Sequence, residues 1–201
     1  MKNEKHIEKV REVVKRACRH QKNYFGGRTW ECHILPVVNH SLKLGRKMKA
    51  DLEVLELAAL LHDYANLVDA KKYAEEHHYY GAKFAEDILK NYSYPQKKIE
   101  RIKDCILSHR GSKKIPHKSL ESRILASADA MSHISELADM FFLTYGIHKF
   151  GSLEGSRWLR DKLNRSWQKT MKEGKKLIKK DYEIAIKILN KNVNGILRYE
   201  K

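Results

Sequence analysis

Apolar residues recur at spacings of three and four along most of this chain, which is the period of an α-helix. The segments with this period are residues 4–20, 31–49, 52–68, 77–91, Pro95 to His109, 119–144 as one helix or two, and a last stretch striped from Trp167 to Val193. Loops are expected from Gly111 to Pro116 and from Gly146 to Gly155. Residues 52–68 are apolar on nearly all sides, which favours a central helix of the core. No segment alternates in the way that a half-buried strand does, so the pattern predicts an all-α protein.

The length of 201 residues suits one well-buried core and is short for two. We find no internal repeat and no linker rich in proline, glycine or serine. The interpretation is a single all-helical domain, a helical bundle, over residues 1–201.

Composition narrows the location of the protein. No apolar run approaches the roughly 18 residues of a membrane span, and residues 1–14 lack the apolar core of a signal peptide. We therefore expect a cytoplasmic protein with no membrane association. The three cysteines, Cys18, Cys32 and Cys105, are scattered, which disfavours a disulfide framework and a cysteine zinc site.

The formal net charge is +16, which attracts anions such as phosphates, nucleotides or nucleic acid. The lysines are spread along the chain and form no long block, so a solvated basic surface is the simpler interpretation. A nucleic-acid-associated protein is the weakest hypothesis, because the sequence shows no recognition helix, aromatic stacking platform or zinc finger.

The strongest chemical signal is His62-Asp63, which ends the apolar run Val54 to Leu61. A buried charge is tolerated only beside a partner or a metal. Asp129 raises the same question, because it lies between Ala128 and Ala130 on a helix expected to be buried.

Three further histidines fall where they could join this pair. His33 begins the second helix, His77 begins the helix over residues 77–91, and His109 continues the apolar face of Ile102 and Ile106. Taken singly, a histidine on an apolar face is more often only hydrogen-bonded. The order His, His-Asp, His, His, Asp on helical segments is typical of a metal-ligand set, and mixed imidazole and carboxylate donors suit Mn, Fe, Co, Ni or Zn.

Residues 30–133 resemble the HD superfamily of metal-dependent phosphohydrolases, in particular its small stand-alone group. The resemblance rests on the segments Trp30-Glu31-Cys32-His33, Leu57-Ala58-Ala59-Leu60-Leu61-His62-Asp63, His77-His78-Tyr79-Tyr80-Gly81-Ala82, Ile106-Leu107-Ser108-His109 and Ala126-Ser127-Ala128-Asp129-Ala130-Met131. It implies an HD-type bundle with its core at about residues 30–133 and the C-terminal helices packed on that core.

The resemblance also implies roles for single residues. His33, His62, Asp63 and Asp129 would bind a divalent transition metal, while His77 and His109 would hold either a second metal or phosphate. Basic residues near these motifs, Arg110 and Lys113, are candidates to hold the substrate phosphate, since arginine binds phosphate in a bidentate way and lysine as a point charge.

Departures from the family leave the substrate open. Tyr64-Ala65-Asn66 follows His62-Asp63, where alarmone hydrolases of the superfamily carry an acidic pair and the 5′-nucleotidase branch a glutamate. Ala128 replaces the first acid of the usual Asp-Ala-Asp segment, and no segment typical of cyclic-di-GMP hydrolysis follows.

The leading hypothesis is a divalent-metal-dependent phosphohydrolase that uses metal-activated water on a small phosphate ester such as a nucleotide. The alternative is an HD module that binds metal or nucleotide without turnover. The expected partner is a small phosphorylated substrate, and the oligomeric state stays open.

Overall fold

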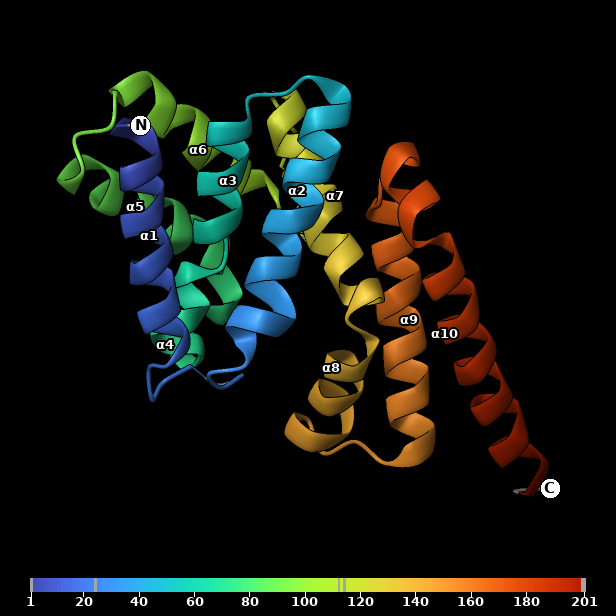
Figure 1. The fold of residues 1–201 in the computed structure, drawn as a ribbon. Helices are drawn as coiled ribbons and strands as arrows, with labels where there is room; N and C mark the ends of the chain where they lie inside the picture. Colours follow the sequence, from blue (N-terminus) through green and yellow to red (C-terminus); the bar gives the residue numbers. More distant parts are fainter. Residues whose placement is uncertain (1, 24, 112, 114, 200–201) are drawn as a thin grey trace. The chain divides into compact units, whose positions relative to one another are not determined.

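The computed structural model describes residues 2–23, 25–111, 113 and 115–199, and within these ranges every regular element is a helix (Figure 1). This confirms the all-α class. The chain divides into two compact units, an N-terminal unit of residues 1–129 and a C-terminal unit of residues 130–201. The expectation that residues 1–201 form one domain stays a prediction.

The N-terminal unit consists of helices and short helical turns. They are α1 (Lys2–Cys18), the π-helical turn η1 (Trp30–Ile34), α2 (Leu35–Met48), α3 (Leu52–Leu61), α4 (Tyr64–Tyr73), the 3-10 turn η2 (Ala74–Glu76), α5 (His77–Asn91), α6 (Gln96–Ser108) and the start of α7 (Leu120–Ser135). The hydrophobic periodicity located α5 and α6 well, and Pro95 is the N-cap of α6 as its fixed φ allows.

Helix α3 is the centre of this unit. It packs against α1, α2 and α6, and all but three of its ten residues are buried apolar side chains. Leu57, Leu60 and Leu61 are fully buried in the main hydrophobic cluster. The side chain of Asp51 caps the helix by accepting a hydrogen bond from the amide of Val54 at 3.2 Å.

The predicted helix over residues 52–68 is wrong in one respect, because the chain breaks at His62-Asp63. Helix α3 ends at Leu61 and α4 begins at Tyr64, with Asp63 as its N-cap at φ −108° and ψ 12°. Consecutive side chains on an unbroken helix point about 100° apart. The break allows His62 and Asp63 to face the same point. Apolar residues continue on both sides of the break, so the sequence pattern does not indicate that a helix ends there.

The C-terminal unit contains the end of α7, α8 (Leu137–Phe141), the π-helical turn η3 (Phe142–Ile147), α9 (Ser152–Lys169) and α10 (Lys172–Tyr199). Helices α9 and α10 pack against each other, and Trp167 stacks on Tyr182 with ring centroids 4.3 Å apart. The last predicted stretch is therefore two helices, because Thr170 takes an extended conformation between them. The second predicted loop is also shorter than expected, since α9 begins at Ser152.

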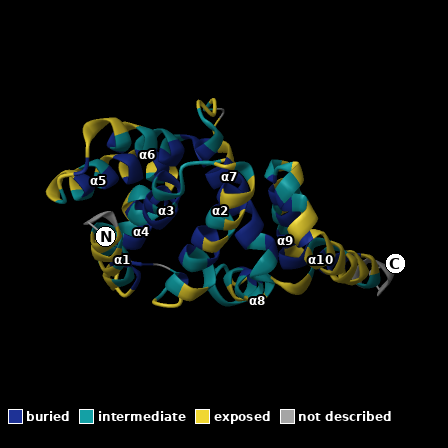
Figure 2. Cartoon of the chain, turned by 45° about the horizontal axis from the view of Figure 1, so that its top comes forward, coloured by how far each residue is buried: buried dark blue, intermediate teal, exposed yellow. Residues whose placement is uncertain are grey.

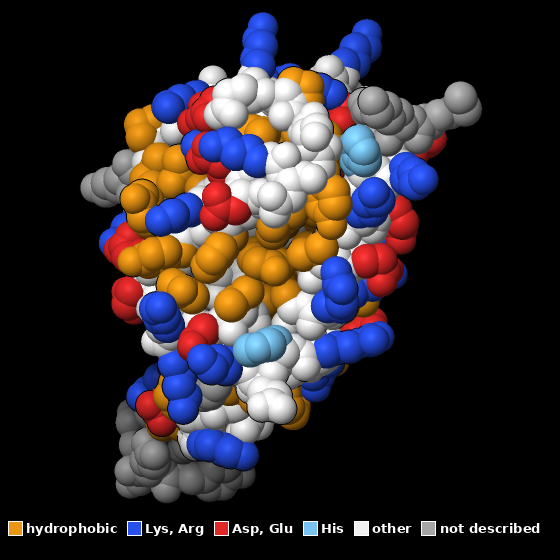
Figure 3. Space-filling model, turned by 90° about the vertical axis from the view of Figure 1, so that its left-hand side faces the viewer, with side chains coloured by type: hydrophobic (Ala, Val, Ile, Leu, Met, Phe, Trp, Pro, Cys, Tyr) orange, Lys and Arg blue, Asp and Glu red, His pale blue; other side chains and the backbone are white. Residues whose placement is uncertain are grey.

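The distribution of charge on the visible surface agrees with the sequence, in which basic residues are dispersed. On the face that lies to the left in Figure 1, lysine and arginine side chains are scattered around a central group of apolar ones (Figure 3). Among the described residues, no helix has the length and apolar content that a membrane span needs.

Candidate metal centre

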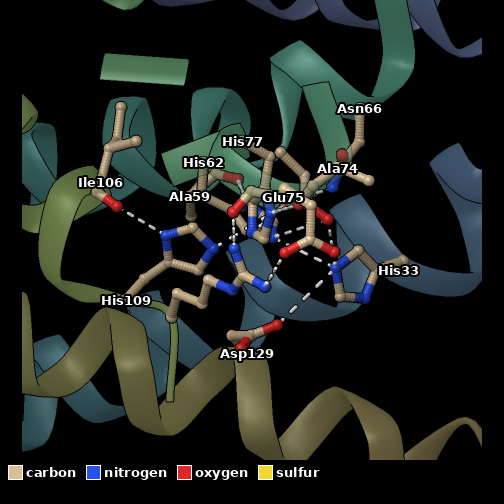
Figure 4. Close-up of polar contacts among 12 residues, drawn as sticks. His33, Ala59, His62, Asn66, Ala74, Glu75, His77, Ile106, His109 and Asp129 are labelled. Carbon is tan, nitrogen blue, oxygen red and sulfur yellow. Dashed lines mark hydrogen bonds and ion pairs between the residues drawn. The ribbon is translucent and has the colours of Figure 1, made fainter. Parts of the chain in front are cut away.

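Six side chains predicted for the site come together in the N-terminal unit, five of them from helix ends or turns and Asp129 from within α7. Figure 4 labels five of the six. His33 lies in η1, which is a π-helical turn. Such turns are rare in proteins as a whole but are often found at functional sites. His62 and Asp63 form the break between α3 and α4, and Asp129 lies on α7. His77 starts α5 and His109 directly follows α6.

The first group of donors surrounds His33. Its Nε2 lies 3.1 Å from Nε2 of His62, 3.5 Å from Oδ2 of Asp63 and 3.7 Å from Oδ1 of Asp129. One donor atom each from His33, His62 and Asp129 falls within 4.8 Å of the others, so these atoms could hold a metal ion.

The second group lies on the other oxygen of Asp63. Nε2 of His77 is 3.5 Å and Nε2 of His109 is 3.8 Å from Oδ1 of Asp63. His62, Asp63 and His109 form a second set of donors within 4.8 Å of one another. The Asp63 carboxylate therefore stands between two groups of donors, with one oxygen toward each.

The three histidines that follow helical turns are oriented in the same way. Nδ1 of His62 lies 2.8 Å from the carbonyl oxygen of Ala59, and Nδ1 of His109 lies 2.6 Å from that of Ile106. Nδ1 of His77 makes the same contact with the residue three positions earlier, Ala74, at 2.8 Å. Because a carbonyl oxygen only accepts, each Nδ1 carries the proton, and a neutral ring then turns the lone pair of Nε2 into the site.

Burial and charge adjust the two central groups in a way that suits a cation. Burial lowers the pKa of fully buried His62 to about 4, so its imidazole is neutral at pH 7. Burial alone would raise the pKa of the Asp63 carboxyl, but the neighbouring imidazoles of His62, His109 and His33 hold it well below its usual range. A neutral nitrogen donor and an ionised carboxylate are the states that metal ligands need.

The close approach of α5 to the break helps to bring His77 to the site. A methyl group at Gly81 would lie 3.1 Å from the backbone oxygen of His62 and 3.4 Å from the Ile106 side chain. The absent side chain therefore permits this packing, one helical turn after His77.

The arrangement fits a divalent metal. Two donor atoms that bind the same ion at about 2.1 Å lie roughly 3 to 4 Å from each other, depending on the angle between the two bonds. The separations from 3.1 to 3.9 Å within the first group match this range. Two carboxylates among imidazoles also supply the negative charge that balances a divalent cation.

The two predicted phosphate ligands are held by acids at the turn η2. Arg110 hydrogen-bonds the backbone oxygen of Glu75, and its guanidinium lies 3.8 Å from the Glu75 carboxylate. Nζ of Lys113 lies 3.1 Å from the carboxylate of Glu76. Both cations therefore contact the turn that leads into His77.

Asn66 belongs to the site although it was not among the residues predicted for it. Its Nδ2 donates to Oδ1 of Asp63 at 3.2 Å, and its buried Oδ1 accepts from no other described residue. Asn66 thus orients the carboxylate that stands between the two donor groups. The signal was its spacing, because a residue three positions after Asp63 lies on the same side of α4.

Comparisons with known proteins identify the fold and the family of the chain. The family model for the HD domain matches residues 30–134, and no curated protein matches the chain. The fold is similar to the crystal structure of a predicted HD superfamily hydrolase from an uncultured Thermotogales bacterium, at a TM-score of 0.65 and 19% identity over 94% of this chain and 92% of that one. The expected HD-type fold is confirmed. HD domains generally bind divalent metals, and the superfamily is one of metal-dependent hydrolases. The family model covers just over half of the 201 residues of this chain, so the chain belongs to the HD domain family.

Proposed function

We propose that this protein is a divalent-metal-dependent phosphohydrolase that acts on a small phosphate ester such as a nucleotide. In this proposal His33, His62, Asp63 and Asp129 hold the metal. The observation that supports it most is the convergence of imidazole Nε2 atoms on both oxygens of one carboxylate, with three of the rings fixed by backbone carbonyls.

The reaction needs a nucleophile and a way to neutralise phosphate charge. A bound divalent metal supplies both, because it lowers the pKa of water and polarises a phosphoryl oxygen. His77 and His109 face the second position beside Asp63, where they would hold either a second ion or a phosphate oxygen. Asn66 keeps the Asp63 carboxylate in place through its side-chain amide.

Arg110 and Lys113 complete the proposed site as phosphate ligands. Each contacts a carboxylate of η2, Glu75 or Glu76. A substrate phosphate would compete with these carboxylates for the two cations, as expected where one anion replaces another. The side chain of Glu75 is 93% exposed, so this exchange costs little burial.

The first test is metal analysis of the purified protein, followed by a panel of phosphomonoesters, nucleoside mono-, di- and triphosphates and cyclic nucleotides, with and without added Mn²⁺. We expect bound metal and metal-dependent release of phosphate from at least one class. A protein that binds metal and is inert across the panel would favour the binding module instead.

The second test is Asp63→Ala. Removal of this carboxylate takes a donor from both groups, so metal affinity and turnover should fall by at least about a hundredfold. Loss of a residue that only orients a metal ligand already lowers metal affinity by up to about a hundredfold. Asp161→Ala, which removes an exposed aspartate paired with Arg160, is the matched control. Unchanged turnover of Asp63→Ala in added Mn²⁺ would overturn the mechanism, provided that circular dichroism shows an intact helical fold.

A further inference from the structure

Helix α10 carries a row of apolar side chains on the side that does not face α9. Its buried side consists of residues such as Ile178, Ala185 and Leu189. On another side, Leu177 is 37%, Ile184 58% and Ile188 44% exposed. Figure 2 shows long exposed stretches on this helix. Large exposed apolar residues aligned on one helix mark a binding surface more often than isolated ones do.

The spacing of the row is that of a helix-pairing seam. Positions separated by four, three, four, three and four residues run along it: Leu177, Asp181, Ile184, Ile188, Lys191 and Gly195. Each pair of successive steps spans seven residues, which is the heptad period at which two helices pack side by side. We name these six residues the α10 seam.

Two charges in the α10 seam identify its partner. Asp181 and Lys191 are exposed, and the ion pair recorded on this helix, between Lys179 and Glu183 at 3.7 Å, does not involve them. Among the described residues, neither makes an ion pair. Both charges would face a partner helix packed on the seam, so the partner must present the opposite charges at matching positions.

A second copy of α10 presents those charges if it runs antiparallel. In that register, centred on residue 186, Asp181 of each copy faces Lys191 of the other, and Ile184 faces Ile188. Leu177 faces Gly195, where an added Cβ would meet no atom within 4 Å. The three pairings share one two-fold axis, which makes the surface self-complementary. In a parallel pairing, Asp181 would face its own copy and Lys191 likewise, which repels.

We propose that the α10 seam is a homodimer interface in which two copies of this helix pack antiparallel. A lipid surface is the less suitable occupant, because Asp181 lies within the apolar row and would be pressed unpaired against an anionic bilayer. With three apolar residues and one cross-copy ion pair in each direction, the dimer should be weak and concentration-dependent.

The test is the molar mass of the full chain across a concentration series, by sedimentation equilibrium. We expect the mass to rise toward that of a dimer. Ile184→Asp should raise the dissociation constant by roughly a hundredfold, because symmetry places the change in the interface twice. Asn190→Asp, which adds the same charge at an exposed position of α10 outside the seam, should leave the constant unchanged.

A charge exchange tests the register. Asp181→Lys and Lys191→Asp should each weaken the dimer by about tenfold, and the double variant should restore it, because both cross-copy pairs reform in reverse. Three results would overturn the proposal: a monomer at every concentration, a dimer unaffected by Ile184→Asp, or a double variant as weak as the sum of the single ones. Binding of the monomer to phosphatidylserine vesicles that Ile184→Asp abolishes would assign the row to lipid instead.

Discussion

The two units of this chain depart from the usual distribution of residues in opposite ways. The N-terminal unit places polar groups inside, where His62 is fully buried and His109 nearly so among apolar helices. The C-terminal unit places apolar groups outside, where Ile184 and Ile188 stand exposed on α10. Folding stability alone favours the reverse of both arrangements.

Each departure marks a place where something other than folding stability selects the residues. A buried polar cluster is stable when a ligand or a complete set of hydrogen bonds satisfies it, and an exposed apolar row is stable when a partner covers it. The first unit therefore points to a small charged ligand and the second to another protein surface.

Truncation of an apolar side chain should lower the free energy of unfolding much more in the core of the N-terminal unit than on the exposed row of α10. Leu60→Ala opens a cavity in the fully buried core of the N-terminal unit and should lower the free energy of unfolding by about 2–5 kcal/mol. Ile184→Ala, on the exposed row, should change it by less than about 0.5 kcal/mol at low protein concentration. Urea unfolding followed by circular dichroism measures both, and equal losses would contradict the comparison.

The buried polar cluster should also leave a signature in the pH dependence of stability. The pKa of His62 is about 4 in the folded protein against an ordinary value of 6.5, so the unfolded chain binds the proton more readily. In protein treated with a chelator, the free energy of unfolding should be highest above pH 6.5 and fall by up to about 3 kcal/mol toward pH 4.

This decline can be assigned to one ring by a pair of variants. His62→Gln should flatten the decline between these pH values, whereas His20→Gln, at an exposed position, should retain it. A decline of the same size in both variants would show that other groups cause it. The contribution of Asp63 lies lower on the pH scale, because its pKa falls below 3.8 and its stabilisation is lost only as pH falls past that value.

A residue that touches no donor nitrogen should still affect metal binding. Asn66→Ala removes the amide that donates to Oδ1 of Asp63, so we expect metal affinity to fall by about 10- to 100-fold. Isothermal titration with Mn²⁺ measures this, with the exposed Asn190→Ala as control. An unchanged affinity would show that the position of Asp63 does not depend on Asn66.

The smallest effect is expected at the turn η2. Glu75→Gln and Glu76→Gln release Arg110 and Lys113 from their acids. If these cations hold the substrate phosphate, KM should fall by about two- to fivefold, since exposed ion pairs are weak. Glu173→Gln, on α10, is the control, and a KM that rises or stays unchanged would remove the two cations from the proposed site.

Much of the fold follows from periodicity, and the failures have physical causes. Helix α5 begins at His77 and ends at Asn91 as the apolar spacing predicts. The break at His62-Asp63 was missed because the apolar run has no preferred face and contains no glycine or proline to mark an end. The break at Thr170 did have a signal, since Thr170-Met171-Lys172-Glu173 has the spacing of a capping box.

The sequence predicts which residues form the site better than it predicts how their side chains are arranged. The order of histidines and aspartates in the sequence indicates which side chains converge, because each belongs to a recognisable helical segment. The division of the donors between the two oxygens of Asp63 depends on how the helices pack. The pairing of Arg110 with Glu75, which is 35 positions away in the sequence, likewise appears only once the chain is folded.

The backbone contacts of the histidine rings have a consequence for the proton balance of metal loading. Nδ1 of His62 keeps its proton for the Ala59 carbonyl, and its low pKa leaves Nε2 unprotonated at neutral pH. An ion that binds to this nitrogen at pH 7 has no proton to displace. The ring therefore contributes nothing to the buffer-dependent part of the heat in a calorimetric metal titration, and enters the binding reaction as a prepared neutral donor.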